Sequence, residues 1–271
     1  MKTIPASLAL GPLLLGALSL LPLCARAQAT STASESSFTL GAGVAFGPRF
    51  MGSKENQASP ALVADYQHRS GFFASSLRGI GWGGGSDALK YSLALSLRGE
   101  RDEKNEKGGL GGKSGGKELL GMGKVKSSAL GLFTLGSQVH ERLGLHAALE
   151  LPLSHRENGR ALHLGGSLQL LQGPRDTVAL DFGASWGDSK YQRTYFGVNA
   201  QQSQNTGYAI YTPKSGFYQS ELSLNWSRQL NERWGLTSVL GVSHLLGDAA
   251  DSPLARRKTA PQGAVFVTYR Y

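Results

Sequence analysis

The chain of 271 residues contains a single cysteine, Cys24, which lies close to the N-terminus. Without a second cysteine the chain cannot form an internal disulfide, and a cysteine-rich zinc site is excluded. Long apolar runs are also scarce. After the first 27 residues, no window reaches the roughly 18 consecutive apolar residues that a membrane-spanning helix needs. A membrane location would therefore require a closed β-barrel, the other structure that satisfies every backbone polar group in lipid.

The first 27 residues have the pattern of a secretory signal peptide. Lys2 precedes an apolar stretch at 8–23, which is too short and too interrupted by glycine and proline to span a membrane. Ala25 and Ala27 then occupy the small-residue positions of an A-x-A cleavage site. The sequence therefore predicts export, with cleavage after Ala27.

The exported chain has a short polar segment at 28–36 and one predicted domain at 37–271. Cys24 would leave with the signal; a lipoprotein signal through this residue fits less well, because a bulky leucine precedes it. Loss of Lys2 and Arg26 takes the formal net charge from +9 to +7. A basic surface suits anionic lipid head groups or acidic polymers, although it could equally serve solubility alone.

Beyond residue 36 the sequence alternates between apolar and small or polar residues. Every second residue from Leu89 to Leu97 is apolar, and the residues between them are small or polar. A strand has this period of two and a helix does not. The same pattern recurs, more weakly in the second and third segments, at 38–46, 61–68, 71–82, 143–154, 161–171, 177–186, 217–228, 233–246 and 263–271.

The two faces of these segments differ in a way that favours a membrane barrel. Most segments are about ten residues long, the length of a tilted transmembrane strand. One face is rich in leucine and has aromatic residues near its ends: Tyr91, Trp186, Tyr218, Trp226 and Trp234. The other face carries the charged residues Lys90, Arg98, Glu150, Asp181 and Glu221. Isoleucine, common in the core of a soluble sandwich, occurs only three times.

These patterns predict an all-β protein, a transmembrane antiparallel up-and-down β-barrel. Bacterial barrels have an even number of strands, so we expect ten or twelve. The regions 119–139 and 191–211 leave that count open. The charged residues on the inner face either line a small channel or pair with one another and fill the lumen, and we slightly favour a filled lumen.

The connections show both tight turns and long loops. Asn158-Gly159 is a strong hairpin signal between two patterned segments. The stretches 173–176 and 230–233 are also predicted to be tight links. Longer connections are expected at 47–59, 99–126, 187–215 and 247–261. Within the second of these, the Gly- and Lys-rich stretch 99–118 is predicted to be a mobile loop.

Candidate catalytic and metal sites are weak. "GGKS" at 111–114 lacks the first glycine of a phosphate-binding loop. The six histidines do not have zinc-site spacing. His68 and Ser70 could form a His-x-Ser pair of a lipid-modifying barrel, although no orienting carboxylate is evident. The aspartates Asp65, Asp87 and Asp102 are better explained as surface residues than as a protease site. We therefore predict a non-enzymatic protein with no catalytic, cofactor-binding or metal-binding residues.

Four short motifs are spread along the exported chain. The central one is Tyr195-Phe196-Gly197-Val198, followed by polar residues. The others are "LGAGVAFGPRFMGS" at 40–53, "ELLGMGKV" at 118–125 and "LLGDAADSPL" at 245–254. Together and in this order they resemble the motifs of the MipA/OmpV family, the MltA-interacting outer-membrane proteins, and the Gly- and Lys-rich stretch at 99–117 is a departure from the family pattern.

The resemblance implies a location in the outer membrane of a Gram-negative bacterium, in contact with outer-membrane lipid and lipopolysaccharide. It also implies a scaffold that joins a murein transglycosylase to a penicillin-binding synthase. A small diffusion or uptake channel is the alternative, and a barrel lipid-modifying enzyme using His68 and Ser70 is a remote one. No nucleic-acid partner is expected.

The chain ends on "GAVFVTYRY", a final strand with no polar tail. Val265, Val267, Tyr269 and Tyr271 fall on one face, which we expect to face lipid, and Phe266 falls on the inner face. Alternating apolar residues before a terminal aromatic resemble the signal read by the barrel-assembly machinery, here Val267, Tyr269 and Tyr271. We expect this strand to pair with the first one, because closure removes free edges.

Overall fold

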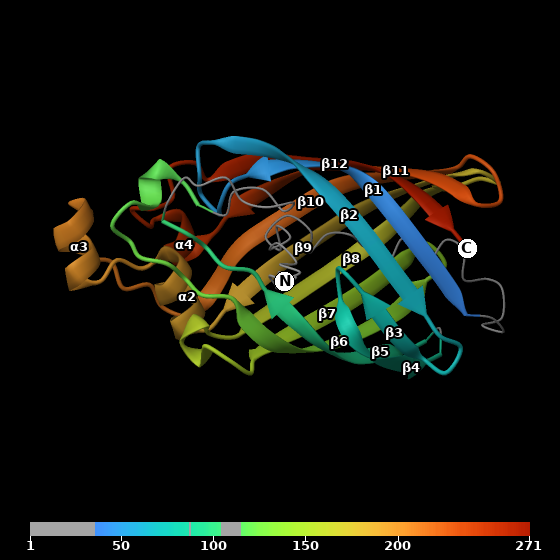
Figure 1. Ribbon diagram of the computed structural model, residues 1–271, viewed down its shortest axis with the longest axis horizontal. Coiled ribbons are helices and arrows are strands. Elements are labelled where there is room, and N and C mark those ends of the chain that lie inside the picture. Colours follow the sequence, from blue (N-terminus) through green and yellow to red (C-terminus); the bar gives the residue numbers. More distant parts are fainter. Residues whose placement is uncertain (1–35, 87, 104–114) are drawn as a thin grey trace, which may run out of the picture.

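A closed antiparallel barrel is the fold of the chain in a computed structural model, which describes residues 36–86, 88–103 and 115–271. Within these residues, twelve strands follow one another around the barrel in chain order. The last strand returns to the first, pairing from Thr39 with Arg270 to Phe46 with Gly263. The predicted fold is confirmed with the larger of the two expected strand counts (Figure 1).

The strands are β1 (Ser37–Pro48), β2 (Asn56–Gln67), β3 (Phe72–Ser75), β4 (Gly79–Gly85), β5 (Lys90–Arg98), β6 (Ser128–His140), β7 (Leu143–Pro152), β8 (Ala161–Gln172), β9 (Asp176–Gly187), β10 (Gly216–Gln229), β11 (Trp234–Leu245) and β12 (Thr259–Arg270). The helices are η2 (Lys117–Leu119), η3 (Arg156–Asn158), α2 (Ser189–Phe196), α3 (Ala200–Thr206) and α4 (Gly247–Ala250). None of the helices in the described part of the chain is long and apolar enough to cross a membrane.

The alternation of the sequence becomes the inside and outside of the barrel. On β5, Leu95 points outward and is 65% exposed, whereas its neighbour Ala94 points inward and is 4% exposed. Large apolar side chains cover the outside on most strands, among them Val44, Leu62, Trp82, Leu93, Leu164, Leu224, Leu240 and Val265. An exterior of this kind is stable against lipid and would be costly in water.

The two ends of the barrel differ in the length of their connections. At one end, here called the long-loop end, the strands are joined by residues 49–55, 99–127, 153–160, 188–215 and 246–258, whereas the turn 76–78 between β3 and β4 lies partway along the wall, beside Ala64 of β2. At the other, the turn end, the connections include 68–71, 141–142, 173–175 and 230–233. The tight links predicted at 173–176 and 230–233 are therefore confirmed. In Figure 1, α2, α3 and α4 gather at the end opposite the C-terminus. In outer-membrane barrels the short turns face the periplasm.

Several local predictions need correction. The segment 71–82 is two strands, because β3 ends at Ser75 and β4 begins at Gly79. The uncertain region 119–139 contributes β6, whereas 191–211 holds α2 and α3 and no strand. The Asn158-Gly159 pair does not form a two-residue hairpin turn. It belongs to the longer connection 153–160, where η3 ends on a buried Asn158.

Tyr218 was expected on the lipid-facing side, but it points into the barrel and is 3% exposed. The pairing of β10 with β9 shifts between Phe217 and Gln219. This bulge changes which side chains of β10 face outward, so Phe217 is exposed on the outside of the barrel in place of Tyr218. The other expected belt residues, Tyr91, Trp186, Trp226 and Trp234, remain at least partly exposed.

Candidate functional site: the capped mouth of the barrel

Helix α2 lies in the mouth of the barrel and forms the centre of a buried aromatic cluster. It starts where the Asp188 carboxylate accepts a hydrogen bond from the Tyr191 backbone N–H at 2.8 Å. Tyr191 and Tyr195 are four residues apart, as are Gln192 and Phe196, so all four lie on the buried side of the helix. The Tyr191 and Tyr218 rings stack at 4.8 Å, and their hydroxyls are 3.1 Å apart. Burial raises the pKa of Tyr191 and of Tyr195, so both phenols stay neutral.

The connection 153–160 packs against the start of α2. A Cβ atom on Gly159 would lie 2.0 Å from the Tyr191 backbone nitrogen, and Gly159 has a φ of +73°. Only glycine fits this close approach, which explains the Asn158-Gly159 pair without a hairpin turn. The Thr194 hydroxyl also donates to the Glu157 carbonyl at 3.0 Å.

Arg98, at the end of β5, joins this connection to the barrel wall. Its guanidinium lies 2.6 Å from the Glu150 carboxylate and donates to the carbonyls of Asn158 and Gly159 at 3.1 and 2.9 Å. His163 lies 3.4 Å from the same carboxylate. The buried pair therefore fixes the position of 153–160, and with it the seat of α2.

Arg101, three residues further on, holds the other end of α2. It donates to the Tyr195 carbonyl at 2.7 Å and to the Thr194 carbonyl at 3.0 Å. These carbonyls belong to the last turn of the helix, where backbone acceptors lack helical partners and a cation is favourable. Burial lowers the pKa of Arg101 to about 10, which leaves the guanidinium charged at neutral pH.

A second apolar cluster lies among the long loops. It is formed by Phe50, Leu119, Met122, Val198 and Leu254, with Tyr208 and Tyr211 packed against it. These residues come from the connections 49–55, 99–127, 188–215 and 246–258. A cluster drawn from four separate loops behaves as a small protein core, because each loop buries apolar surface only by contacting the others.

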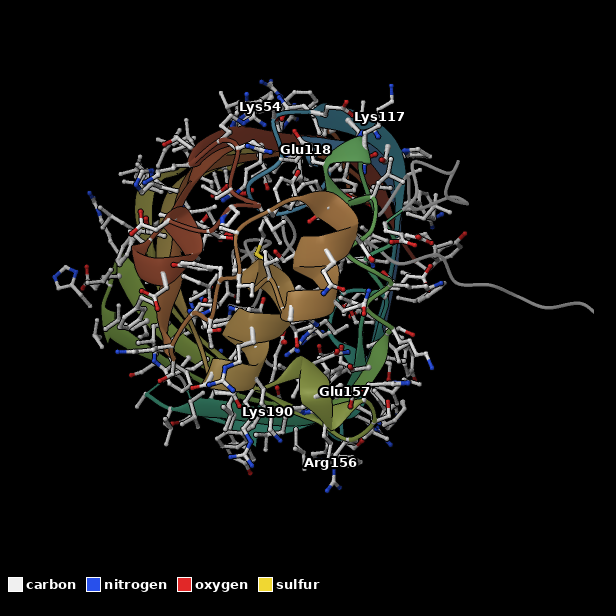
Figure 2. All side chains as sticks on the ribbon, turned by 90° about the vertical axis from the view of Figure 1, so that its left-hand side faces the viewer. Lys54, Lys117, Glu118, Arg156, Glu157 and Lys190 are labelled. Atoms are coloured by element: carbon white, nitrogen blue, oxygen red, sulfur yellow. The ribbon has the colours of Figure 1, made fainter. Side chains whose placement is uncertain are left out.

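Hydrogen bonds tie the same loops together. The Ser252 hydroxyl donates to the Phe196 carbonyl at 2.6 Å, and the Tyr208 hydroxyl donates to the Glu118 carbonyl at 3.0 Å. Val198 and Tyr211 form a two-residue antiparallel bridge. We call the described residues of these connections, together with 153–160, the cap. Figure 2, which looks at the long-loop end, shows α2 and α3 lying across the middle of the barrel.

The expected inward residues line the barrel below the cap. Arg98 and Glu150 pair with each other, as the interpretation of a filled lumen required. Asp181 contacts Asn225, and Glu221 contacts Gln219, in each case through the side-chain amide. Polar side-chain pairs thus fill part of the lumen. The cap also covers the mouth of the barrel, which the sequence did not indicate.

Of the remaining candidate residues, the structure brings His68 and Ser70 together and places Asp65 in an ion pair of its own. His68 Nδ1 lies 2.7 Å from the Ser70 hydroxyl, in the exposed turn 68–71. Asp65 instead pairs with Arg78 at 3.0 Å. The described residues contain no group of three or more His, Cys, Asp or Glu side chains that could hold a metal ion. Asp87 and the stretch 111–114 lie outside the described residues.

The final strand has the orientation expected from its sequence. Phe266 points inward and is buried, whereas Val265, Val267 and Tyr271 are exposed on the outside. The Tyr271 ring stacks on Phe38 at 5.6 Å, which adds an aromatic contact to the seam between β12 and β1. The assembly signal itself stays a prediction. So does signal cleavage, because Ala25 and Ala27 lie outside the described residues.

A family comparison identifies what these features belong to. The family described as MltA-interacting protein MipA matches residues 40–271. The chain belongs to this MipA family. Its four shared motifs meet in the cap: Phe196 is at the centre of the first cluster, and Val198, Phe50, Leu119 and Leu254 form the second. Membership and the apolar barrel exterior together place the protein in the outer membrane.

Solved barrels resemble this chain only distantly. The NanC porin is 8% identical, with a TM-score of 0.45, covering 86% of this chain and 98% of that one. The COG4313 outer membrane channel from Pseudomonas putida F1 is 11% identical, with a TM-score of 0.43, covering 87% and 94%. The CymD monoaromatic hydrocarbon channel is 11% identical, with a TM-score of 0.37, covering 93% and 91%. Among curated proteins, no sequence matched the chain.

Proposed function

We propose that this protein is a non-enzymatic adaptor of the outer membrane that holds peptidoglycan-remodelling enzymes, a murein transglycosylase and a penicillin-binding synthase, at its periplasmic side. The observation that carries the proposal is the cap. The segments shared with the family meet in a folded core across the mouth, which suits a closed barrel better than an open passage. The family description, MltA-interacting protein, supports a protein partner.

The turn end offers the surface for such a partner. Arg142, Arg175 and Arg233 each stand at the end of a short turn, and all three are exposed. Their backbone carbonyls accept hydrogen bonds at 2.7 to 2.9 Å from Gln169, Gln229 and Arg270 of the following hairpin or strand. Successive turns are two strands apart, so these arginines are spaced about 10 Å from one another. Such an arc of guanidinium groups suits an acidic protein surface.

A capture experiment from detergent extracts tests this proposal. The wild-type barrel should enrich a murein transglycosylase well above an unrelated outer-membrane barrel. Replacing Arg142, Arg175 and Arg233 together by Ser should abolish the enrichment. The matched control replaces Lys54, Lys117 and Lys190 by Ser, since these three lie at the long-loop end (Figure 2), and it should retain the enzyme. Equal recovery with the unrelated barrel would contradict the proposal.

A small channel is the second candidate, and the inner wall favours it. Asp181, Ser223, Asn225 and Glu221 present polar groups to the lumen, as expected for a path that carries water-soluble molecules. Planar-bilayer recordings on the refolded protein distinguish the two functions. Steps of conductance in the wild-type protein would support the channel, whereas a silent barrel would support the adaptor.

A further inference from the structure

Exposed basic residues gather on one side of the long-loop end. Two belong to the connection between β7 and β8 and two belong to α2, and we call them the basic cluster: Arg156, Arg160, Lys190 and Arg193. The two segments touch, because the Thr194 hydroxyl donates to the Glu157 carbonyl at 3.0 Å. Figure 2 shows Arg156 and Lys190 on the same side of the rim, opposite Lys54.

The charges of the basic cluster are not balanced by neighbouring acids. Elsewhere at this end, an exposed cation such as Lys258 pairs with Asp251 at 3.1 Å. By contrast, no member of the basic cluster forms an ion pair with a described residue. The acids in the same two segments are Glu157 and Asp188, and the Asp188 carboxylate already accepts the Tyr191 N–H at 2.8 Å. A surface with this excess of positive charge attracts an anion.

Below the basic cluster, the exterior of the barrel has an apolar hollow of about 620 Å³. Its walls are formed by outward-facing side chains of β6 to β9 that are 39–42% exposed, namely Leu135, Leu145, Leu164 and Phe182. Ala147 and Ala184 stand in the same cross-strand row as two of these leucines and are too small to fill it. Gly136, Gly165 and Gly183 align in the next row, so part of the floor is bare backbone. An exposed apolar hollow of this kind suits a hydrocarbon chain.

The basic cluster and the hollow belong to the same part of the wall, within reach of one lipid molecule. Arg160 directly precedes β8, and Leu164 follows it by four residues, about 13 Å along the strand. One leaflet of a bilayer, with its head groups, spans roughly 20 Å. Leu153, which is 50% exposed, and the partly exposed Trp186 lie between the two features. Cations at the rim with apolar surface directly below them are complementary to a lipid that has an anionic head group.

We propose that the basic cluster and the hollow together bind one molecule of lipopolysaccharide in the outer leaflet. The guanidinium groups of Arg156, Arg160 and Arg193 donate to the phosphates of its lipid A, and one acyl chain lies in the hollow. The position favours this lipid over a phospholipid. Since the short turns of such barrels face the periplasm, the long-loop end lies in the outer leaflet, where lipopolysaccharide is the anionic lipid. This role is independent of the adaptor function, because it leaves the turn end free.

Native mass spectrometry of the refolded barrel in detergent tests the proposal, with bisphosphorylated lipid A as the added probe. A heat-dependent gel shift first confirms that each variant is folded. The test variant replaces three exposed arginines together by Ser: Arg156, Arg160 and Arg193. The matched control removes three exposed cations from other parts of the same end, again by substitution with Ser: Lys54, Lys117 and Lys214. The two variants have the same net charge, so a difference between them reports the position of the cations.

A second pair of variants probes the hollow without changing any charge. Ala184→Leu places a larger side chain in the hollow, whereas Ala42→Leu adds the same bulk to the exposed outer face of β1. Ala184→Leu should reduce the retention of lipid A several-fold, and Ala42→Leu should leave it unchanged. Equal retention by the two variants would overturn the assignment of the acyl chain to the hollow.

For the basic cluster, the expected result is one lipid A retained per wild-type barrel and several-fold less retained by the arginine variant. The lysine control should behave like the wild type, and lipid A without its phosphates should be retained several-fold less by the wild type. Equal retention of lipid A by the arginine variant and the lysine control would overturn the proposal. Retention of phosphatidylglycerol as strong as that of lipid A would overturn it as well, because the site would then not select lipopolysaccharide.

Discussion

The two ends of this barrel use the same residue types for opposite purposes. At the long-loop end, Arg98 and Arg101 are buried and saturated with carboxylate and carbonyl acceptors. At the turn end, Arg142, Arg175 and Arg233 are exposed on connections of a few residues. An arginine in the cap thus acts as a structural element, whereas the arginines on the turns stay at the surface of the barrel.

The largest effect is expected at the turn end, on assembly rather than stability. Deleting Tyr271 removes the terminal aromatic, its stacking on Phe38 and the hydrogen bond from its N–H to the Phe38 carbonyl. Most of the protein should then be lost from the outer membrane, more than for any single change in a long loop. Quantitative immunoblotting of outer-membrane fractions measures this. Wild-type levels of the truncated protein would show that the last residue is not part of an assembly signal.

Arg98→Ala should cause the largest loss of stability among cap variants. The substitution leaves the Glu150 carboxylate buried without its cation and removes the donors to Asn158 and Gly159. Breaking a buried ion pair in this way costs about 3–5 kcal/mol. Urea unfolding in lipid vesicles gives the free energy. Arg98→Lys keeps the charge but loses the forked geometry, so its free energy of unfolding should lie between those of the wild type and Arg98→Ala. An unchanged unfolding midpoint for Arg98→Ala would refute the assigned role.

Ser252→Ala should have an intermediate effect. The buried hydroxyl donates to the Phe196 carbonyl and accepts from the Leu254 N–H, so its loss leaves two backbone groups unsatisfied. The expected cost is about 1–3 kcal/mol. Limited proteolysis of intact cells or proteoliposomes should show faster cleavage within 188–215 or 246–258. A cleavage rate equal to wild type would mean that this hydroxyl does not hold the loops together.

The smallest effect is expected for Arg228→Ala, near the turn end. Arg228 lies 3.6 Å from Asp176, and both side chains are substantially exposed. An exposed pair contributes less than about 1 kcal/mol. The unfolding midpoint should therefore stay close to wild type, in contrast to Arg98→Ala. A loss as large as that of the buried pair would remove the distinction between the two ends.

The barrel itself could be predicted because its alternation is a local property of the sequence. Leu95 and Phe266 were assigned to the correct faces from the period of two alone. The bulge at Phe217 could not be predicted. One extra residue there reverses which side chains face outward, and the residue types of the segment do not reveal it. Tyr218 was consequently placed on the wrong face.

The cap could be predicted only in part, because it depends on contacts between distant segments. The motif residues Phe196 and Val198 were singled out by resemblance, but nothing local shows that they meet Phe50 and Leu254. Asn158-Gly159 has the composition of a tight turn, yet the carbonyls of both residues accept from Arg98, and Gly159 is needed for contact with α2. Pro60 is a local signal that this part of β2 has strand pairing on one side only among the described residues.

Amide hydrogen exchange tests the central claim, that the long loops form a folded cap across the mouth, most directly. The bridge between Val198 and Tyr211 and the buried segment around Ser252 should exchange slowly, on the timescale of the barrel strands. The N–H of Glu232, on an exposed turn, forms no hydrogen bond with a described residue and serves as the internal reference for fast exchange. Slow exchange in 196–198 and 252–254 is the predicted result, and exchange there as fast as at Glu232 would contradict the account.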